Sequence, residues 1–512
     1  MKLAVALTAL VTALLLTTVP AIQASPGAGV SWQAAASDAD VDRYFAQARV
    51  EKKPVLLYWG AKWCPPCNQL KATLFNRADF IEQSKAFVAI GIDGDAPGAQ
   101  RLGTRFKVQG YPTLILLNPN GNEITRLPGE ADAAQVMKVL QLGLSSGRPV
   151  KAVLADAMAG RKLSTNEWRM LGFYSWDTDE QQLVTNAKRA ATLARLAKAS
   201  EGSDFEATTR LWLKSIGETE SGKADPGELP RLHSVLTSAV QARAQMDVLT
   251  NGAPDLVKAF APQPGPTRDK LVAAFDAALQ RLNQDQTLAR ADRLGALLSR
   301  VELARLDVPA KELRPSSIPA PLVAEVREQV AKLDRELTNS YERQAVIPGA
   351  SQLLARTGLW TESDDLLKAE LVRSHSAYYL MGHLAGNAKR QGRRADALHW
   401  YKEAFNASEG PATRLQWGTN YVAALVELSP EDASSIEAVA AQLFAEAGKD
   451  PGSFYERSQI SLKRLAGVLA KWNQGSSQAA VVDRLKSRLD AECGKLGAGD
   501  ARAKTACEGL MR

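Results

Sequence analysis

The stretch WCPPC at residues 63–67 decides the fold, because it places two thiols where a buried strand is expected to turn into a helix. The apolar run VLLYW at residues 55–59 precedes it and predicts the strand. A thiol at a helix N-terminus faces unpaired backbone N–H groups and the positive end of the helix dipole, which stabilise its thiolate. Cys64 is therefore the expected nucleophile. Cys67, one turn further in, is expected to attack a mixed disulfide at Cys64 and release the partner.

The first residues predict an export signal. Lys2 gives a positive start, residues 3–19 are almost wholly apolar, and PAIQA at residues 20–24 offers small residues for cleavage. This pattern predicts a signal peptide over residues 1–24 and a periplasmic or secreted mature protein. The alternative is an uncleaved membrane anchor, for which the apolar stretch is short and lacks a stop-transfer flank.

Length and charge narrow the class of protein. At 512 residues the chain exceeds one ordinary core, so two or three domains are expected. It carries 63 Lys and Arg residues against 56 Asp and Glu residues, a net charge of +7. The basic residues are interspersed with acidic ones and form no run that would follow a phosphate backbone, so no nucleic-acid partner is expected.

The chain has four cysteines, an even number that in an exported protein indicates two disulfides. Zinc is the competing use, but the four histidines lie far from Cys64 in the sequence. We therefore expect no metal and no cofactor. Cys493 and Cys507 flank a glycine-rich loop, and a structural disulfide there would contribute up to about 3 kcal/mol. The alternative is a second redox pair that exchanges with Cys64.

The N-terminal part alternates between strand and helix patterns. Strands are expected at residues 55–59, 87–92, 113–117 and 123–127, and helices at residues 37–50, 64–73, 100–106 and 131–142. An Asn-Gly pair at residues 120–121 predicts a hairpin between the last two strands. Strands separated by helices, then a hairpin and a final helix, predict a small α/β domain with a central mixed sheet flanked by helices.

Residues 31–147 resemble the thioredoxin family. The resemblance is carried by WCPPC at residues 63–67, by GYPT at residues 110–113 before an apolar strand, by the Asn-Gly hairpin and by Gly129. It implies a thioredoxin-like domain over residues 25–147 and thiol–disulfide oxidoreductase activity of Cys64 and Cys67. Pro112 matches the family's cis-proline, which implies substrate binding by Trp63, Tyr111 and Pro112. The alternative for Pro112 is a plain turn proline.

Two finer likenesses imply a reducing role. The segment FNRADF at residues 75–80 resembles the periplasmic domain of membrane disulfide-reducing transporters and related exported thioredoxins. Pro-Pro between the cysteines is similar to tryparedoxins, which act as reductants. The implied partners are protein thiol or disulfide substrates and a membrane thiol–disulfide reductant.

The chain departs from the family at one buried ion pair. Thioredoxins usually carry an acid six residues before the first cysteine and a lysine on the next strand. Here these positions are Tyr58 and Ala89, so both charges are missing together, which avoids an unpaired buried charge. A tyrosine hydroxyl, with a reference pKa of about 10, is a poor substitute for the acid in the resolving step. Lys62 would support the Cys64 thiolate or is a surface residue.

The rest of the chain has helical patterns alone. LSSGRP at residues 144–149 marks a boundary, after which we expect an all-helical region over residues 148–350. Gly and Pro predict breaks between helices, one of them at residues 251–254. Residues 358–371 align with residues 392–405 at an offset of 34 (392 − 358), the tetratricopeptide period. We therefore expect TPR-like repeats over residues 351–512, including the C-terminal disulfide segment. Aromatic residues there are expected to pack between helices: Trp360, Trp400, Tyr401 and Trp417.

Two functions remain in competition. The first is an exported protein-disulfide reductase that acts through Cys64 and Cys67 while the helical region docks a partner protein. The second is a non-catalytic binding protein in which the helical array binds a partner and the thioredoxin-like domain is structural. The loss of the acid at Tyr58 and of the lysine at Ala89 favours the second.

Overall fold

A computed structural model describes residues 29–108, 110–129, 131–309, 314–497 and 500–511. The predicted signal peptide at residues 1–24, and the alternative of a membrane anchor there, lie outside the described residues. Within the described part, no helix has the length and apolar character needed to cross a membrane.

The N-terminal part contains a five-stranded mixed sheet in the order β1-β3-β2-β4-β5. β1 and β2 run parallel to β3, whereas β4 is antiparallel to β2 and to β5. The strands are β1 (Gln33–Ala34), β2 (Val55–Gly60), β3 (Val88–Asp93), β4 (Thr113–Leu117) and β5 (Glu123–Leu127). The four strands predicted from the sequence are confirmed, and β1 is an addition.

Helices cover both faces of this sheet. They are α1 (Asp38–Glu51), α2 (Pro65–Ala72), α3 (Ala78–Gln83), α4 (Ala99–Phe106) and α5 (Ala133–Ser146). Side chains of the central strand β2 alternate between two cores, as strand geometry requires. Leu56 and Tyr58 pack with α2, α3 and α5, while Leu57 and Trp59 pack with α1 and α4. The predicted α/β fold is thus confirmed, and α2 leaves the carboxyl end of its central strand.

All described elements after β5 are helical. The α-helices are α6 (Val150–Met158), α7 (Thr165–Gly172), α8 (Asn186–Ala199), α9 (Phe205–Gly217), α10 (Leu229–Thr237), α11 (Ala239–Ala244), α12 (Met246–Phe260), α13 (Pro266–Gln284), α14 (Arg290–Ala304), α15 (Ala320–Glu336), α16 (Ser340–Arg356), α17 (Trp360–Glu370), α18 (Ala377–Arg390), α19 (Arg394–Ala407), α20 (Pro411–Leu428), α21 (Ala433–Ala447), α22 (Glu456–Trp472), α23 (Ala479–Lys495) and α24 (Ala501–Glu508). Short 3-10 helices are η1 (Ser84–Ala86), η2 (Pro226–Glu228), η4 (Pro315–Ser317), η5 (Pro451–Phe454) and η6 (Gln474–Ser476).

The predicted break at residues 251–254 is wrong, because α12 continues through Pro254. Proline has no N–H to donate to the carbonyl four residues earlier, which here belongs to Thr250. The hydroxyl of Ser299 on α14 donates to that carbonyl instead. A neighbouring helix therefore satisfies the group that would otherwise have ended α12.

Two helix pairs repeat the same turn. Gly358 follows α16 and Gly392 follows α18, and both glycines have positive φ, at 81° and 72°. In each turn the residue after the glycine donates its N–H to a carbonyl of the preceding helix: Leu359 to Leu354, and Arg393 to Ala388. These turns agree with the predicted 34-residue offset between α16–α17 and α18–α19. The tetratricopeptide class itself stays a prediction.

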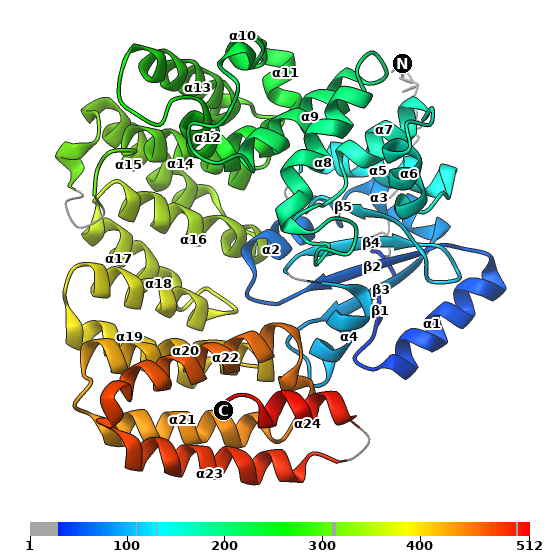
Figure 1. Cartoon of the computed structure of the whole chain (residues 1–512). Coiled ribbons are helices and arrows are strands. Elements are labelled where there is room, and N and C mark those ends of the chain that lie inside the picture. Colours follow the sequence, from blue (N-terminus) through cyan, green and yellow to red (C-terminus); the bar gives the residue numbers. More distant parts are fainter. Residues whose placement is uncertain (1–28, 109, 130, 310–313, 498–499, 512) are drawn as a thin grey trace, which may run out of the picture.

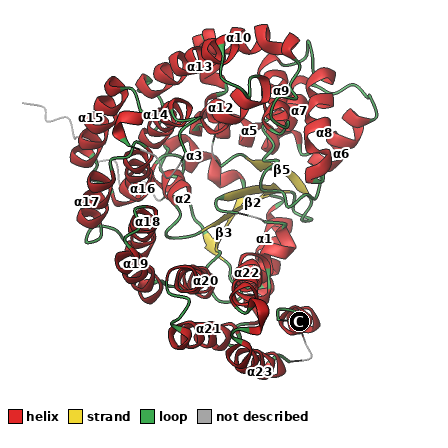
Figure 2. Ribbon diagram, turned by 60° about the vertical axis from the view of Figure 1, so that its left-hand side comes forward, coloured by secondary structure: helices red, strands yellow, loops and turns green. Residues whose placement is uncertain are grey.

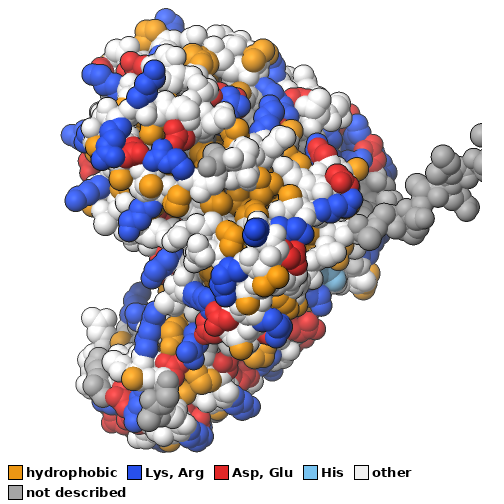
Figure 3. Space-filling model, turned by 90° about the vertical axis from the view of Figure 1, so that its right-hand side faces the viewer, with side chains coloured by type: hydrophobic (Ala, Val, Ile, Leu, Met, Phe, Trp, Pro, Cys, Tyr) orange, Lys and Arg blue, Asp and Glu red, His pale blue; other side chains and the backbone are white. Residues whose placement is uncertain are grey.

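The helices from α6 to α24 form an arc that curves around the sheet (Figures 1 and 2). The arc contacts the sheet domain at several places: α2 packs against α16, α4 against α22, α5 against α7, and β5 against α6. On the face shown in Figure 3, Lys and Arg side chains lie among acidic and uncharged ones. The helical region therefore borders the domain that carries the cysteine pair along part of its surface and leaves α1 on the outside (Figure 1).

Candidate active site

The cysteine pair lies at the N-terminus of α2. Cys64 is the N-cap residue, and Cys67 is the third residue of the helix; the two sulfurs form a disulfide. The backbone N–H of Cys67 donates to Cys64 Sγ at 3.2 Å. Pro65 and Pro66 occupy the first two helical positions, where proline fits because their N–H groups would have no partner within the helix. The local sequence thus directs a single N–H group of the first turn, that of Cys67, at the expected nucleophile.

Asn68 fixes the loop that leads into α2. Its side chain is fully buried, and Nδ2 donates to the carbonyls of Lys62 at 2.9 Å and Cys64 at 2.8 Å. Two carbonyls at the strand-to-helix turn are thereby held in one orientation. Nothing in the sequence pattern singled out Asn68, although its place directly after the second cysteine is the signal that could have found it.

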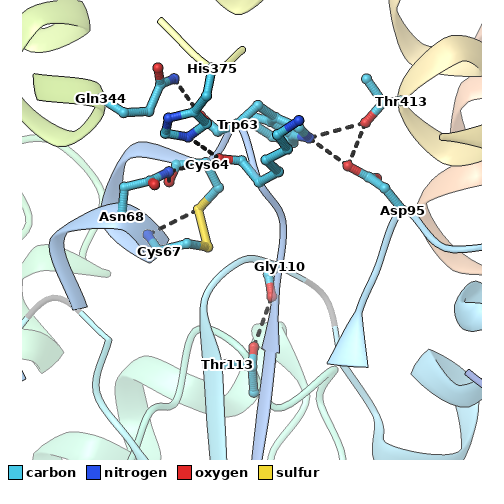
Figure 4. The surroundings of a disulfide bond; sticks show 11 residues. Trp63, Cys64, Cys67, Asn68, Asp95, Gly110, Thr113, Gln344, His375 and Thr413 are labelled. Carbon is cyan, nitrogen blue, oxygen red and sulfur yellow. Dashed lines mark hydrogen bonds between the residues drawn. A yellow bond between two sulfur atoms is a disulfide. The ribbon is translucent and has the colours of Figure 1, made fainter. Parts of the chain in front are cut away.

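The GYPT segment forms the neighbouring turn. The Tyr111–Pro112 peptide bond is cis, and Thr113 Oγ1 donates to the Gly110 carbonyl at 2.8 Å (Figure 4). A Cβ atom on Gly129 would lie 2.9 Å from Pro112 Cγ, so this close approach requires glycine. The Tyr111 ring contacts the Trp63 ring edge-on at 6.0 Å between centroids. The structure therefore brings Trp63, Tyr111 and Pro112 into one region.

The indole of Trp63 is held by the helical region. It stacks on Tyr379 of α18, with centroids 5.3 Å apart at 23°, and meets Trp417 of α20 edge-on at 5.3 Å. Its Nε1 donates to Asp95 Oδ2 at 2.7 Å and to Thr413 Oγ1 at 3.0 Å (Figure 4). The residue before Cys64 thus belongs to an interface between the two parts of the chain.

Asp95 also forms an ion pair with a residue of the helical region. Arg457 Nη1 lies 2.9 Å from Asp95 Oδ1, and the guanidinium lies over the rings of both Trp63 and Tyr111. The Thr413 hydroxyl donates to Asp95 Oδ2 at 2.6 Å. A charged group of α22 and a hydroxyl of α20 therefore hold the same carboxylate.

The backbone of the active-site loop is bonded to the helical region as well. Gln344 Nε2 of α16 donates to the Trp63 carbonyl at 2.9 Å, and His375 Nε2 donates to the Lys62 carbonyl at 3.2 Å. Burial lowers the pKa of His375, which favours its neutral form. The Lys62 side chain is exposed and pairs with Glu409 at 3.4 Å. Sequence reasoning missed these partners because each lies hundreds of residues from the cysteines.

The contacts that α16, α18, α20 and α22 make with the Trp63 loop are called the helical cover below. Under this cover the two sulfurs are buried. Cys64 is 2% exposed and Cys67 is fully buried, in one core with β2, β4 and α5. Cys493 of α23 and Cys507 of α24 form the other disulfide, within a different core of C-terminal helices. The structure therefore separates the two cysteine pairs.

Tyr58 takes the place of the missing acid without taking over its charge. Its hydroxyl is buried and has no hydrogen-bond partner among the described residues, and burial with the nearby Asp93 raises its pKa. Tyr58 lines a cavity of about 590 Å³ together with Lys71 and Asp93. Burial raises the pKa of Asp93 and lowers the pKa of Lys71. Ionisable groups thus lie beside Tyr58, at positions that the sequence comparison did not point to.

Within the described part of the chain, no group of three or more metal-ligating side chains comes together.

The aromatic residues that were expected to pack between helices also contact the active-site loop or line a cavity. Trp417 is buried between helices and donates its Nε1 to the Tyr378 carbonyl at 3.1 Å, yet it also contacts Trp63. Trp360 and Tyr401 line a cavity beside it.

Known proteins resemble the N-terminal part. A family model described as a thioredoxin-like domain matches residues 41–143. The thiol:disulfide interchange protein DsbD 2 of Pseudomonas aeruginosa is 33% identical over 99 residues, which are 19% of this chain and 17% of that protein. DsbD of Yersinia pestis is 34% identical over 98 residues, 18% of this chain and 16% of the relative. The chain therefore matches only about a sixth of the length of these two relatives.

A smaller relative is matched over most of its length. A thioredoxin-like protein of Synechocystis is 31% identical over 90 residues, which are 18% of this chain and 81% of that protein. The match of the family model, at residues 41–143, includes the WCPPC stretch and ends before α6.

Proposed function

Because the chain belongs to the thioredoxin-like family, we propose that it is an exported thiol–disulfide oxidoreductase that reduces protein disulfides. The observation that carries the proposal is the position of Cys64, at the N-cap of α2 with the Cys67 N–H directed at its sulfur. Trp63, Tyr111 and Pro112 beside it are the proposed substrate contacts. The proposal of export rests on the predicted signal peptide, and a periplasmic location of the protein agrees with it.

The proposed reaction transfers two electrons in two exchanges. The Cys64 thiolate attacks a substrate disulfide, which forms a Cys64–substrate bond and releases one substrate thiolate. The Cys67 thiolate then attacks Cys64 Sγ, which releases the second substrate thiolate and leaves the Cys64–Cys67 disulfide. A membrane thiol–disulfide protein is the proposed electron donor that reduces this disulfide again.

The Pro-Pro pair supports the reducing direction. Pro65 and Pro66 carry no N–H, so the first turn of α2 offers the Cys64 sulfur the Cys67 N–H alone. Fewer donors stabilise the thiolate less, and a less stable reduced form makes the pair a stronger reductant. The helix dipole remains available to keep Cys64 reactive.

The helical cover sets a condition on the reaction. Cys64 is 2% exposed, and Trp63 is bonded to α20. A protein disulfide therefore reaches Cys64 only after the Trp63 loop separates from α18 and α20. We propose that the structure represents the covered state, and that docking of a partner on the helical region favours the separated one.

Reduction of insulin by dithiothreitol, followed as turbidity, tests the activity. We expect catalysis by the wild-type chain and none by Cys64→Ser. The matched control is the double variant Cys493→Ser/Cys507→Ser, which removes the other disulfide and is expected to retain the rate. Equal rates for the wild type and Cys64→Ser would reject the proposal. A Cys67→Ser variant is expected to trap the substrate as a mixed disulfide.

The second candidate function is a binding protein with a structural thioredoxin-like domain. The burial of both sulfurs and the contacts on Trp63 favour it. Alkylation of the native protein discriminates between the two functions. A Cys64–Cys67 disulfide that resists mild dithiol would support the binding protein, whereas rapid reduction and labelling of Cys64 would support the enzyme.

A further inference from the structure

A cavity of about 560 Å³ lies between the helical region and the active-site loop. Trp63, the residue before Cys64, lines it together with residues of α16, α18, α19 and α20. Its volume is within the range of about 300–1,000 Å³ that is typical of ligand pockets. The cavity thus adjoins the cysteine pair and is larger than a single inorganic anion needs.

The lining is strongly basic. The lining contains one acidic residue, Glu427, and five cationic side chains: Arg305, Arg356, Lys389, Arg390 and Arg464. Glu427 pairs with Lys389, and Glu302 pairs with Arg305 and Arg356. No carboxylate of the described residues pairs with Arg390. The positive charge of the cavity is therefore only partly neutralised within the chain.

Two guanidinium groups of the lining, Arg305 and Arg390, are incompletely compensated by the chain. The Arg305 side chain is 8% exposed, and its buried Nε has no hydrogen-bond partner among the described residues. Burial lowers the pKa of Arg390, and the cations of Arg356 and Arg305 lower it further. Cations brought together in a partly buried space repel one another, and an anion between them relieves this repulsion.

Two glycines keep the cavity open. Gly382 and Gly386 lie one turn apart within α18, and both line the cavity. Glycine inside a helix costs about 1 kcal/mol relative to alanine, so this pair has an energetic cost. A Cβ atom would lie 3.7 Å from Arg390 Nη1 at Gly386 and 3.6 Å from Trp417 Nε1 at Gly382, which are ordinary contacts. The glycines are thus not required by tight packing, and their effect is to leave space.

We propose that this cavity binds an acidic polypeptide segment of the substrate. Carboxylates of the segment pair with Arg390 and Arg305, and its apolar groups pack on Tyr379 and Trp417. The inference rests on the proposed oxidoreductase function, because the bound segment lies beside Trp63 and so brings a neighbouring disulfide close to Cys64. The presence of both guanidinium groups and aromatic rings in the lining fits a peptide better than inorganic phosphate.

Fluorescence anisotropy of a labelled, cysteine-free peptide rich in glutamate tests the proposal on the Cys64→Ser chain. The comparison peptide has glutamine in place of every glutamate. We expect the glutamate peptide to bind about tenfold more tightly at low salt, and Arg390→Gln to remove most of this difference. The matched control is Arg327→Gln, because Arg327 is exposed, pairs with Glu362 and lies outside the cavity. Gly386→Leu, which fills the cavity without changing charge, is expected to weaken binding as well.

Equal binding of the two peptides would overturn the proposal. So would unchanged binding by a folded Arg390→Gln chain, or displacement of the peptide by inorganic phosphate as complete as by unlabelled peptide. Because the peptide contains no cysteine, its binding needs no thiol exchange, and the result is independent of the insulin assay. Peptide binding without insulin reduction would reject the oxidoreductase function and retain the proposed binding of an acidic segment. Insulin reduction without peptide binding would reject only the proposed binding.

Discussion

Trp63 Nε1 lies 3.0 Å from Thr413 Oγ1, so the residue before the nucleophilic cysteine is hydrogen-bonded to a helix 350 residues further along the chain. The same hydroxyl donates to Asp95, which in turn accepts from Trp63. Two side chains of the sheet domain and one of the helical arc therefore form one small hydrogen-bond network at the active-site loop.

Removing the Thr413 hydroxyl is expected to loosen the cover. Thr413→Val deletes two hydrogen bonds of the network, and a loss of about 1 kcal/mol would raise the separated population about fivefold. We expect iodoacetamide to alkylate Cys64 of the reduced variant faster by that factor, as measured by mass spectrometry.

Thr419→Val on the same helix is the matched control, because Thr419 Oγ1 donates to the Ser461 carbonyl of α22, a hydrogen bond within the helical region. Unchanged alkylation in Thr413→Val, or equal acceleration in both variants, would contradict a specific role of Thr413 in the cover.

Restoring one backbone donor is expected to make the cysteine pair less reducing. Pro66→Ala adds an N–H in the first turn of α2, where it can stabilise the Cys64 thiolate. A gain of about 1 kcal/mol corresponds to roughly 20 mV for two electrons, so the potential should become less negative by about that amount. Equilibration with glutathione buffers measures the shift. A more negative potential would show that the prolines act by another route.

The Asp292 carboxylate is expected to make stability depend on pH. Burial raises its pKa to about 6, and the nearby Asp132 contributes, while Gln69 Nε2 of α2 donates to Asp292 Oδ1 at 2.7 Å. A carboxyl whose folded pKa exceeds its unfolded value stabilises the fold at low pH, and this stability is lost as pH rises from about 4 through about 6. Asp292→Asn keeps the acceptor and removes the charge.

We therefore expect Asp292→Asn to be more stable than the wild type by roughly 1–2 kcal/mol at neutral pH and equal to it near pH 4. Urea unfolding, followed at both pH values, measures the difference. Gln69→Glu, at the residue that donates to Asp292, tests the opposite change. It places a second carboxylate beside Asp292 and is expected to be most destabilising at neutral pH. A stability difference for Asp292→Asn that does not change with pH would contradict the raised pKa.

Tyr58→Phe is expected to leave catalysis intact. The hydroxyl is buried without a hydrogen-bond partner, so its removal should be neutral or stabilising by up to about 1 kcal/mol. Thermal unfolding and the insulin assay measure the two effects. A clear loss of the resolving rate in Tyr58→Phe would instead assign the hydroxyl a proton-transfer role.

The sheet domain was predictable because its signals are local. A fully buried strand, a Cys-x-x-Cys helix start and an Asn-Gly turn each lie within a few residues, and together they specify β2, α2 and the β4–β5 hairpin. β1 spans only Gln33–Ala34, which is too short for any periodicity to show. The break predicted at Pro254 failed because the compensating group, Ser299, comes from another helix.

The cover of the active site was not predictable for a related reason. Gln344, Tyr379 and Thr413 carry no motif, and their importance arises only from how the helical arc brings them to Trp63. Periodicity indicates which face of a helix is apolar, but it does not identify the element that this face meets. The sequence therefore located the cysteines and their strand-to-helix turn, while their partners required the tertiary structure.

The separation between Trp63 and Thr413 also imposes an order on biosynthesis. Chains grow from the N-terminus at about 5–20 residues per second, so Thr413 is made roughly 20–70 s after Trp63. The sheet domain has its complete set of local elements long before α18 and α20 exist. Until Thr413 is made, the Trp63 loop lacks its hydrogen-bond partner on α20, so the complete covered state forms only after that point of synthesis.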